Sequence, residues 1–446
     1  MNRMAVMVTR GKDRLTKAVE LTREPLLANA GYLTGIDLVG SVVGFVFWGL
    51  AARLYQPEDV GTASVVLSAV ALVSGIAGLG MGTGLVRFLP EVRSPRRLLN
   101  TALTCSIGTA FLTCGVFLAG LPVWSPSLVA LQRNGLYAVG FLAYVVAATL
   151  GSLVSEAFVA HRQASYALIH TCVVNICRLL LVAVLAGLGT VGLVGSVALA
   201  VVLALTLSLW GLLPRVDPGY RPRPGVSWAN LVAVIPYSLG NYVAGLLAQT
   251  SQTVIPLMTM EILGPASSGY AYIALMVGSL LTSPGVALAG SAFAEGSNAP
   301  QKLLPILTRA AALGLALTVP VALILCVCAP YFLLLFGPRY AREAAGLLRW
   351  LALAAPLIVL SRLYFTHLRV QKQIGRLILL SGIVAAATLG VAAVLMPRLG
   401  IAANGVGLLV GHSLVAAVAS GRWMRQNGPG GIIRRVGTVS NIRLWR

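Results

Sequence analysis

The chain has 446 residues, of which 33 are Lys or Arg and 12 are Asp or Glu, so charged residues make up only 10%. A soluble domain carries about 25% charged residues, and this deficit excludes an ordinary water-soluble enzyme. Hydrophobic residues reach 58%, and they gather in long runs instead of the short alternating segments of an outer-membrane barrel. Because backbone groups inside a bilayer must satisfy one another, we predict an all-α polytopic membrane protein.

The formal net charge of +21 does not indicate a nucleic-acid partner. Lys and Arg fall in short links between apolar runs, and no basic domain is present that could hold a duplex. The six cysteines lie inside apolar runs, which favours packing over disulfides, and no histidine pair has the spacing of metal ligands. We therefore expect no metal or cofactor, and we interpret the basic links as topology signals.

Residues 1–29 are expected to form a cytoplasmic N-terminal segment. Within residues 14–24, Leu15, Ala18 and Val19 fall on one side, which predicts a short helix at the membrane interface. The first apolar run starts near residue 30, is long enough to span, and lacks a small-residue cleavage site. We expect this first helix to remain in the mature protein.

Six spans are predicted within residues 30–213, which we interpret as an N-lobe. They cover residues 30–52, 60–86, 98–121, 135–158, 165–187 and 190–213. Glu58 and Asp59 stand at the start of the second span, where negative charge favours a helix N-terminus.

Two acidic residues of the N-lobe are candidates for cation coupling. A charge at mid-bilayer costs about 2.5 to 3.5 kcal/mol, so an intramembrane carboxylate marks a wet cavity or a function. Asp37 shares a face of the first span with Ser41 and Gly44, and Glu156 lies near the inner end of the fourth span. The structural alternatives are an arginine partner or an interfacial position for Asp37, and snorkelling to water for Glu156.

The fifth span carries the clearest candidate for substrate binding. Arg178 lies about halfway along it, and Thr171, Asn175 and Arg178 follow one another at helical spacing on one face. A guanidinium can hold a pyrophosphate through two hydrogen bonds, so we predict a polar stripe that contacts an anionic substrate. The alternative is a buried arginine paired with Glu156 or Asp37.

Residues 214–228 form a polar stretch broken by four prolines, unlike the short links around it, and we predict a cytoplasmic linker. Six further spans follow within residues 229–421, the expected C-lobe. They cover residues 231–255, 267–290, 304–330, 345–366, 376–396 and 401–421. Residues 422–446 form a basic cytoplasmic tail that we expect to lie along anionic lipid heads.

In the C-lobe, the seventh span presents a stripe of neutral polar side chains. These are Tyr237, Asn241, Gln249 and Gln252. Amides and a phenol bind sugar hydroxyls without burying a charge, so we predict sugar contact, with polar helix packing as the alternative.

Arg349 and Arg362 of the tenth span are further candidates for substrate contact, with snorkelling as the alternative. Prolines at 236, 256, 284, 320 and 356 predict helix breaks or bends in this lobe.

The distribution of basic residues predicts the orientation. Placing the N-terminus inside puts 24 Lys and Arg in inner segments and 5 in outer loops, with four inside spans. Since basic loops mark the cytoplasm, we predict a multi-pass protein of the cytoplasmic membrane with both termini inside.

The two lobes resemble each other in sequence. The segment around Pro57 and Gly61 aligns with the segment around Pro265 and Gly269, at an offset of 208. Leu188-Gly189 lies opposite Leu399-Gly400 at an offset of 211, and 158–163 opposite 367–372. Such internal repeats are typical of transporters whose binding site lies between the repeats.

At these residues the chain resembles the multidrug, oligosaccharidyl-lipid and polysaccharide exporter superfamily, and within it the oligosaccharide flippases. The resemblance rests on 53–61 with 78–91 in the first lobe, and on 263–270, 335–340 and 395–405 in the second. It implies a MATE-like fold of two six-helix bundles around a central cavity that opens alternately to each side. Many flippases of this family have two additional C-terminal helices, and this chain ends after 12.

The resemblance implies transport of a lipid-linked oligosaccharide of the undecaprenyl-pyrophosphate type from the inner to the outer leaflet. The second hypothesis is an exporter of small amphipathic molecules coupled to H⁺ or Na⁺, which Asp37 fits. The net charge and intramembrane arginines favour an anionic cargo.

A membrane glycosyltransferase using Glu58 and Asp59 is disfavoured because the outer loops are short, so we predict no enzyme. A non-transporting scaffold is the remaining alternative. Expected partners are membrane lipids, the lipid-linked glycan and polysaccharide assembly proteins.

Overall fold

The computed structural model describes residues 25–92 and 94–427. Side chains are described throughout these ranges except at residues 25–30, 34, 229–230, 233–241, 244, 248, 298 and 420–427. The predicted interfacial helix at 14–24 and most of the basic tail lie outside the described residues.

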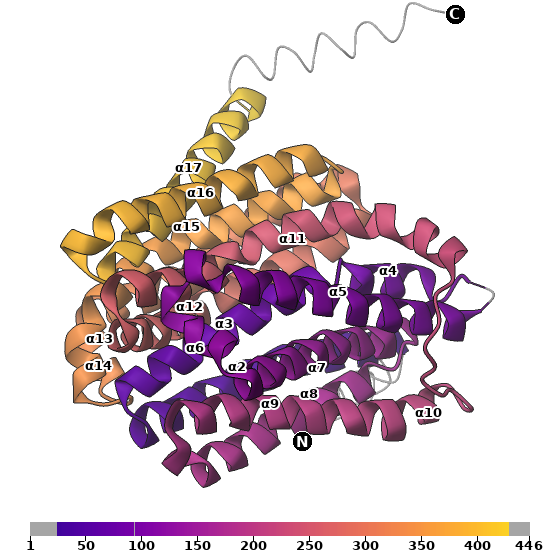
Figure 1. The fold of residues 1–446 in the computed structure, drawn as a ribbon. Helices are drawn as coiled ribbons and strands as arrows, with labels where there is room; N and C mark the ends of the chain where they lie inside the picture. The colour runs from indigo at the N-terminus through magenta and orange to yellow at the C-terminus, as the bar shows by residue number, and fades with distance from the viewer. Residues whose placement is uncertain (1–24, 93, 428–446) are drawn as a thin grey trace, which may run out of the picture. The chain divides into compact units, whose positions relative to one another are not determined.

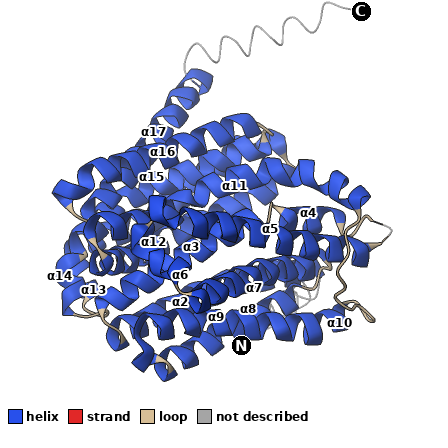
Figure 2. Ribbon diagram, in the orientation of Figure 1, coloured by secondary structure: helices blue, strands red, loops and turns tan. Residues whose placement is uncertain are grey.

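The described chain folds into helices joined by short loops, with no strand in these ranges (Figure 2). Among the described residues, 11 helices are long and apolar enough to cross a membrane. Large apolar side chains on their outer faces are strongly exposed, such as Leu112 at 67% and Val327 at 74%. In a soluble protein such faces would aggregate, whereas a bilayer solvates them. The predicted all-α membrane fold is confirmed, although 11 spans are found where 12 were predicted.

The described residues divide into two compact units. The first contains the residues up to Gln56 together with Val66–Tyr242, and the second contains Pro57–Val65 together with the residues from Val243 onward. The boundary in contacts thus falls inside a helix, α11 (Trp228–Leu263), instead of in the linker. The N-lobe, linker and C-lobe boundaries remain a prediction.

The first unit is built around α7 (Gly135–Ala160), which packs against α4, α5, α8 and α9. The other helices of the N-terminal half are α2 (Pro25–Leu54), α3 (Pro57–Ala77), α4 (Met81–Phe88), α5 (Pro95–Trp124), α6 (Val129–Arg133), α8 (Ala164–Val184), α9 (Gly189–Leu207) and α10 (Leu213–Val216). Its core includes Leu85, Leu98 and Phe158, all nearly inaccessible, so the side chains that face inward are large and apolar.

The second unit is built around α15 (Ala345–Val370), which contacts α12, α13, α16 and α17 (Figure 1). The bounds of these neighbours are α12 (Pro265–Asn298), α13 (Leu303–Leu333), α14 (Pro338–Glu343), α16 (Ile374–Leu399) and α17 (Ala402–Asn427). Helix α11 joins them through its described end, where Asn404 Nδ2 donates to Thr259 Oγ1 at 3.1 Å.

A helix break occurs at a glycine, and no break occurs at three of the prolines for which breaks or bends were predicted. The expected span 60–86 is interrupted after α3, where Leu79 has φ 47° and Gly80 has φ 68° before α4 begins. By contrast, α12, α13 and α15 continue through Pro284, Pro320 and Pro356. A left-handed pair reverses the backbone locally, whereas a proline removes one hydrogen bond that a packed helix can tolerate.

The same turn ends α7 and α15. Gln163 N donates to Phe158 O at 2.9 Å and Arg162 N donates to Val159 O at 2.9 Å. In the second unit, the corresponding donors are Gln373 and Lys372, bonded to Leu368 O at 2.9 Å and Arg369 O at 3.0 Å. Both turns are Schellman motifs, with Arg162 at φ 58° and Lys372 at φ 54°. The two segments therefore correspond at an offset of 210, one residue from the alignment proposed above.

The segments aligned around Pro57 and Pro265 contact each other within the second unit. A Cβ added to Gly61 would lie 1.8 Å from the carbonyl oxygen of Pro265, and one added to Gly269 would lie 2.5 Å from that of Pro57. The contact is reciprocal, because each helix start places its glycine against the other's proline. Only glycine permits such a close approach of two backbones.

Candidate functional site

The polar stripe predicted on the fifth span is formed by contacts along α8. Asn175 Nδ2 donates to the carbonyl oxygen of Thr171 at 2.7 Å, and Arg178 Nη2 donates to Asn175 Oδ1. On α2, the ring of Phe47 lies under the guanidinium, with 5.1 Å from Cζ to the ring centroid. The structure therefore brings Thr171, Asn175 and Arg178 together, and it adds Phe47, which the sequence pattern did not indicate.

These contacts fix the guanidinium of Arg178 in place. Asn175 is 4% exposed, so its amide has little freedom, and a Cβ added to Gly44 would lie 3.5 Å from Arg178 Nη2. A glycine at position 44 thus leaves room for the arginine beside α2. A planar, oriented guanidinium is suited to hold two oxygens of a phosphate or carboxylate group.

The two candidate coupling carboxylates, Asp37 and Glu156, differ in their exposure to solvent. Asp37 is exposed on α2. Glu156 is half-buried on α7, where its Cγ would lie 3.0 Å from a Cβ added to Gly82 of α4. Their role in ion coupling stays a prediction.

The neutral stripe on α11 is described only in part. Tyr237 and Asn241 fall outside the described side chains. Gln249 is exposed, and Gln252 lines a cavity inside the second unit, together with Arg362 of α15 and His412 of α17. The sequence analysis did not indicate this cavity.

Arg349 is placed differently from Arg362, although both belong to α15. Arg349 is exposed, and its Nε donates to the backbone oxygen of Cys326 on α13 at 3.1 Å. This bond secures the side chain to a neighbouring helix, so the guanidinium has one fewer N–H for a substrate. Substrate contact by Arg349 remains a prediction.

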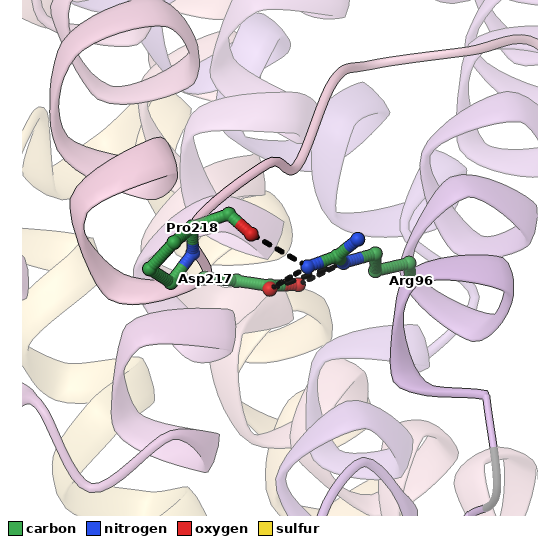
Figure 3. A network of polar contacts seen from close by, with 3 residues as sticks. All are labelled: Arg96, Asp217 and Pro218. Carbon is green, nitrogen blue, oxygen red and sulfur yellow. Dashed lines mark hydrogen bonds and ion pairs between the residues drawn. The ribbon is translucent and has the colours of Figure 1, made fainter.

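The linker that follows α10 is attached to the start of α5 by a bidentate ion pair (Figure 3). Arg96 Nη2 lies 2.6 Å from Asp217 Oδ1 and 2.7 Å from the carbonyl oxygen of Pro218, and its Nε donates to the same carboxylate. Two guanidinium nitrogens thus bind one carboxylate, the geometry that favours arginine over lysine.

Further bonds hold the linker against α5. Tyr220 donates its hydroxyl proton to Asn100 Oδ1 at 2.6 Å, and Ser227 N donates to Thr101 Oγ1 at 3.0 Å. Burial, aided by the nearby charge of Asp217, raises the pKa of Tyr220 to about 12, so the hydroxyl remains a donor at neutral pH. The linker is therefore an ordered strap within the first unit.

The strap and the start of α5 line an open groove of about 760 Å³, and its charged lining residues are basic. Four arginines contribute to it, namely Arg96, Arg97, Arg221 and Arg223. Asp217 binds Arg96, and among the described residues no carboxylate pairs with the other three. Sequence analysis had counted these arginines as topology signals only; the groove is formed because the strap folds back onto α5.

A family model described as polysaccharide biosynthesis protein matches residues 50–345. No curated protein matches the chain in sequence. Among the described residues, no group of three His, Cys, Asp or Glu side chains could hold a metal ion.

Solved structures of low sequence identity share the fold. The lipid II flippase MurJ in an inward closed conformation aligns with a TM-score of 0.71 and 11% identity, covering 87% of each chain. An inward-facing multidrug resistance MATE family transporter aligns with a TM-score of 0.66 and 14% identity, covering 94% of this chain and all of the other. These flippases and transporters are not enzymes, in agreement with the sequence prediction.

The family match covers well over half of the chain, and the fold agrees with it. The chain belongs to the polysaccharide biosynthesis protein family, and it has the fold of a lipid II flippase and of a MATE family transporter.

Proposed function

We propose that this protein moves a lipid-linked oligosaccharide, carried on an undecaprenyl-pyrophosphate type lipid, from the inner to the outer leaflet of the cytoplasmic membrane by alternating access. The observation that carries the proposal is the family match over residues 50–345, joined to a fold shared with a lipid II flippase. Sugar transfer chemistry is not part of the proposal, because flipping requires binding and a conformational change only.

Two features of the first unit support an anionic cargo. Arg178 is half-buried and held in place by Asn175 and Phe47, as a residue that receives a phosphate should be. The strap groove adds Arg97 at the start of α5, and Arg221 and Arg223 in the strap. A cationic amphiphile would be repelled by both, whereas a pyrophosphate would be attracted.

The test is leaflet exchange of an undecaprenyl-pyrophosphate oligosaccharide in proteoliposomes, scored with an impermeant probe that binds or cleaves the sugar. Wild type should accelerate exchange, and Arg178→Ala should reduce it at least tenfold. The matched control is Arg398→Ala, because Arg398 is exposed at the end of α16 and lies outside the proposed site. Absence of exchange in folded wild type with several glycans would overturn the proposal.

The alternative is an exporter of small amphipathic molecules coupled to H⁺ or Na⁺, and the likeness to a multidrug transporter fold keeps it open. In this alternative, Asp37 is the carboxylate that binds the coupling cation. Drug efflux that depends on an ion gradient and disappears in Asp37→Asn, with no lipid exchange, would favour it.

The predicted orientation belongs to the proposal, since the substrate starts in the inner leaflet. With both termini in the cytoplasm, the strap of residues 214–228 faces the compartment where lipid-linked glycans are assembled. Labelling of single cysteines in whole cells tests this: a cysteine at Arg221 should be protected from an impermeant reagent, and one at Ser127 should react.

A further inference from the structure

A small cavity inside the second unit gathers polar side chains from five helices. Its lining includes Gln252 of α11, Ser279 of α12, Arg362 of α15, Ser381 of α16 and His412 of α17. Leu275, Leu351 and Phe365, all largely buried, close it with apolar surface. Residues this distant in sequence meet only because the helices pack around α15.

The cavity has positive charge without a protein counterion. Arg362 lines it, and no Asp or Glu is among the lining residues. Within the described ranges, no carboxylate forms an ion pair with Arg362. The next ionised groups along α15 are also basic, at Arg369 and, beyond it, Lys372. A half-buried guanidinium in low dielectric strongly favours a compensating negative charge.

Two buried polar atoms in this lining also have no hydrogen-bond partner in the described part of the protein. They are Ser381 Oγ, on a residue 2% exposed, and His412 Nδ1, on a residue 8% exposed. Buried polar groups are nearly always satisfied by protein, water or a ligand. A hydroxyl and a ring N–H can both donate, as can the guanidinium, so the three groups together form a set of donors.

The size of the cavity limits what those donors can bind. Its volume is about 60 Å³, which holds roughly four to six water-sized positions. A monatomic anion with a few waters fits this space, whereas a pyrophosphate with its lipid and sugar does not. This separates the cavity from the substrate sites considered above.

We propose that this cavity is a binding site for a small monovalent anion of the halide class, held by Arg362, Ser381 and His412. The anion acts as the counterion that the fold does not supply, and it stabilises the second unit. Nothing in this inference depends on which lipid or drug the protein moves.

The test measures thermal unfolding of the purified full-length protein in chloride and in gluconate at equal ionic strength. Wild type should unfold roughly 2–4 °C higher in chloride, because a ligand that binds the folded state raises its stability. Arg362→Gln should abolish this difference. Arg349→Gln, a change of the same kind on the same helix but outside the cavity, should retain it.

A second measurement covers the case in which Arg362→Gln does not fold. Crystals of wild type grown in bromide should show an anomalous peak inside the cavity, and Ser381→Ala should weaken both this peak and the chloride effect. Equal stability of wild type in both salts, or a bromide-free cavity that contains only water, would overturn the proposal. A chloride effect of the same size in Arg362→Gln would do so as well.

Discussion

The two units of this protein treat an intramembrane arginine in opposite ways. In the first, Arg178 is held by the side chain of Asn175 and lies over the ring of Phe47. In the second, Arg362 faces a cavity whose lining contains no acidic residue. The positions do not correspond, because at the offset of the shared turns, 210 residues, Arg178 is matched by Thr388 and Arg362 by Ser152.

The backbone features of the units do correspond. The Schellman turns after α7 and α15 match, and so do Gly189, with φ 54° and ψ −137°, and Gly400, with φ 57° and ψ −145°. The comparison indicates that the two halves share helix starts and turns, whereas their buried arginines occupy different positions. A backbone turn tolerates many side chains, whereas a buried charge depends on every neighbour.

The largest effect is expected where the repeated segments touch. Gly61→Ala should destabilise the protein by about 2–4 kcal/mol, because its Cβ would lie 1.8 Å from the carbonyl oxygen of Pro265 and the backbone must move. Gly75→Ala on the same helix is the control, since its Cβ would have no neighbour within 4 Å. Thermal unfolding of both variants measures this; equal losses would contradict a special role for the glycine contact.

One pair of variants tests whether Arg178 and Arg362 contribute differently to the stability of the protein. Arg178→Met should cost about 1–3 kcal/mol, because the buried Oδ1 of Asn175 loses its donor. Arg362→Met in halide-free buffer should be neutral or stabilising, because it removes a charge that lacks a protein counterion. Unfolding free energies of both variants are compared in gluconate. Similar losses in both would show that Arg362 is as well compensated as Arg178.

The interaction energy between Phe47 and Arg178 can be measured directly. A double-mutant cycle between Phe47→Leu and Arg178→Met should give a coupling of about 0.5–1 kcal/mol, typical of a cation above an aromatic ring. The cycle of Phe158→Leu with Arg178→Met serves as reference, because Phe158 is buried in the core elsewhere in this unit. A coupling near zero for Phe47 would leave Asn175 as the main support of the arginine.

The smallest effect is expected at the strap. Arg96→Gln should leave global stability nearly unchanged, since the side chain of Arg96 is 52% exposed and solvent screens its ion pair. Chymotrypsin should nevertheless cleave after Tyr220 several-fold faster, because the strap loses its bonds to α5 and Tyr220, now 2% exposed, becomes accessible. Arg97→Gln, the adjacent arginine, is the control and should leave the cleavage rate unchanged.

Sequence patterns were sufficient where a feature depends on neighbours along the chain. The helical class and the approximate spans followed from apolar runs, and the Thr171, Asn175 and Arg178 contacts followed from helical spacing. The break at Leu79 and Gly80 was missed because glycines in a span also favour close helix packing. The helices do not break at Pro284, Pro320 or Pro356, because a packed helix tolerates the loss of one hydrogen bond, and bends at these prolines stay a prediction.

What the sequence alone determined is the membrane class, the positions of most helices, the paired Pro57 and Pro265 segments and the family resemblance. These depend on composition, local periodicity and internal similarity. Only the tertiary structure decided that Phe47 supports Arg178, that the linker folds back to form a basic groove, and that Ser381 and His412 line one cavity with Arg362. Those contacts join helices far apart in the chain, and their energies depend on distances and burial that no local pattern encodes.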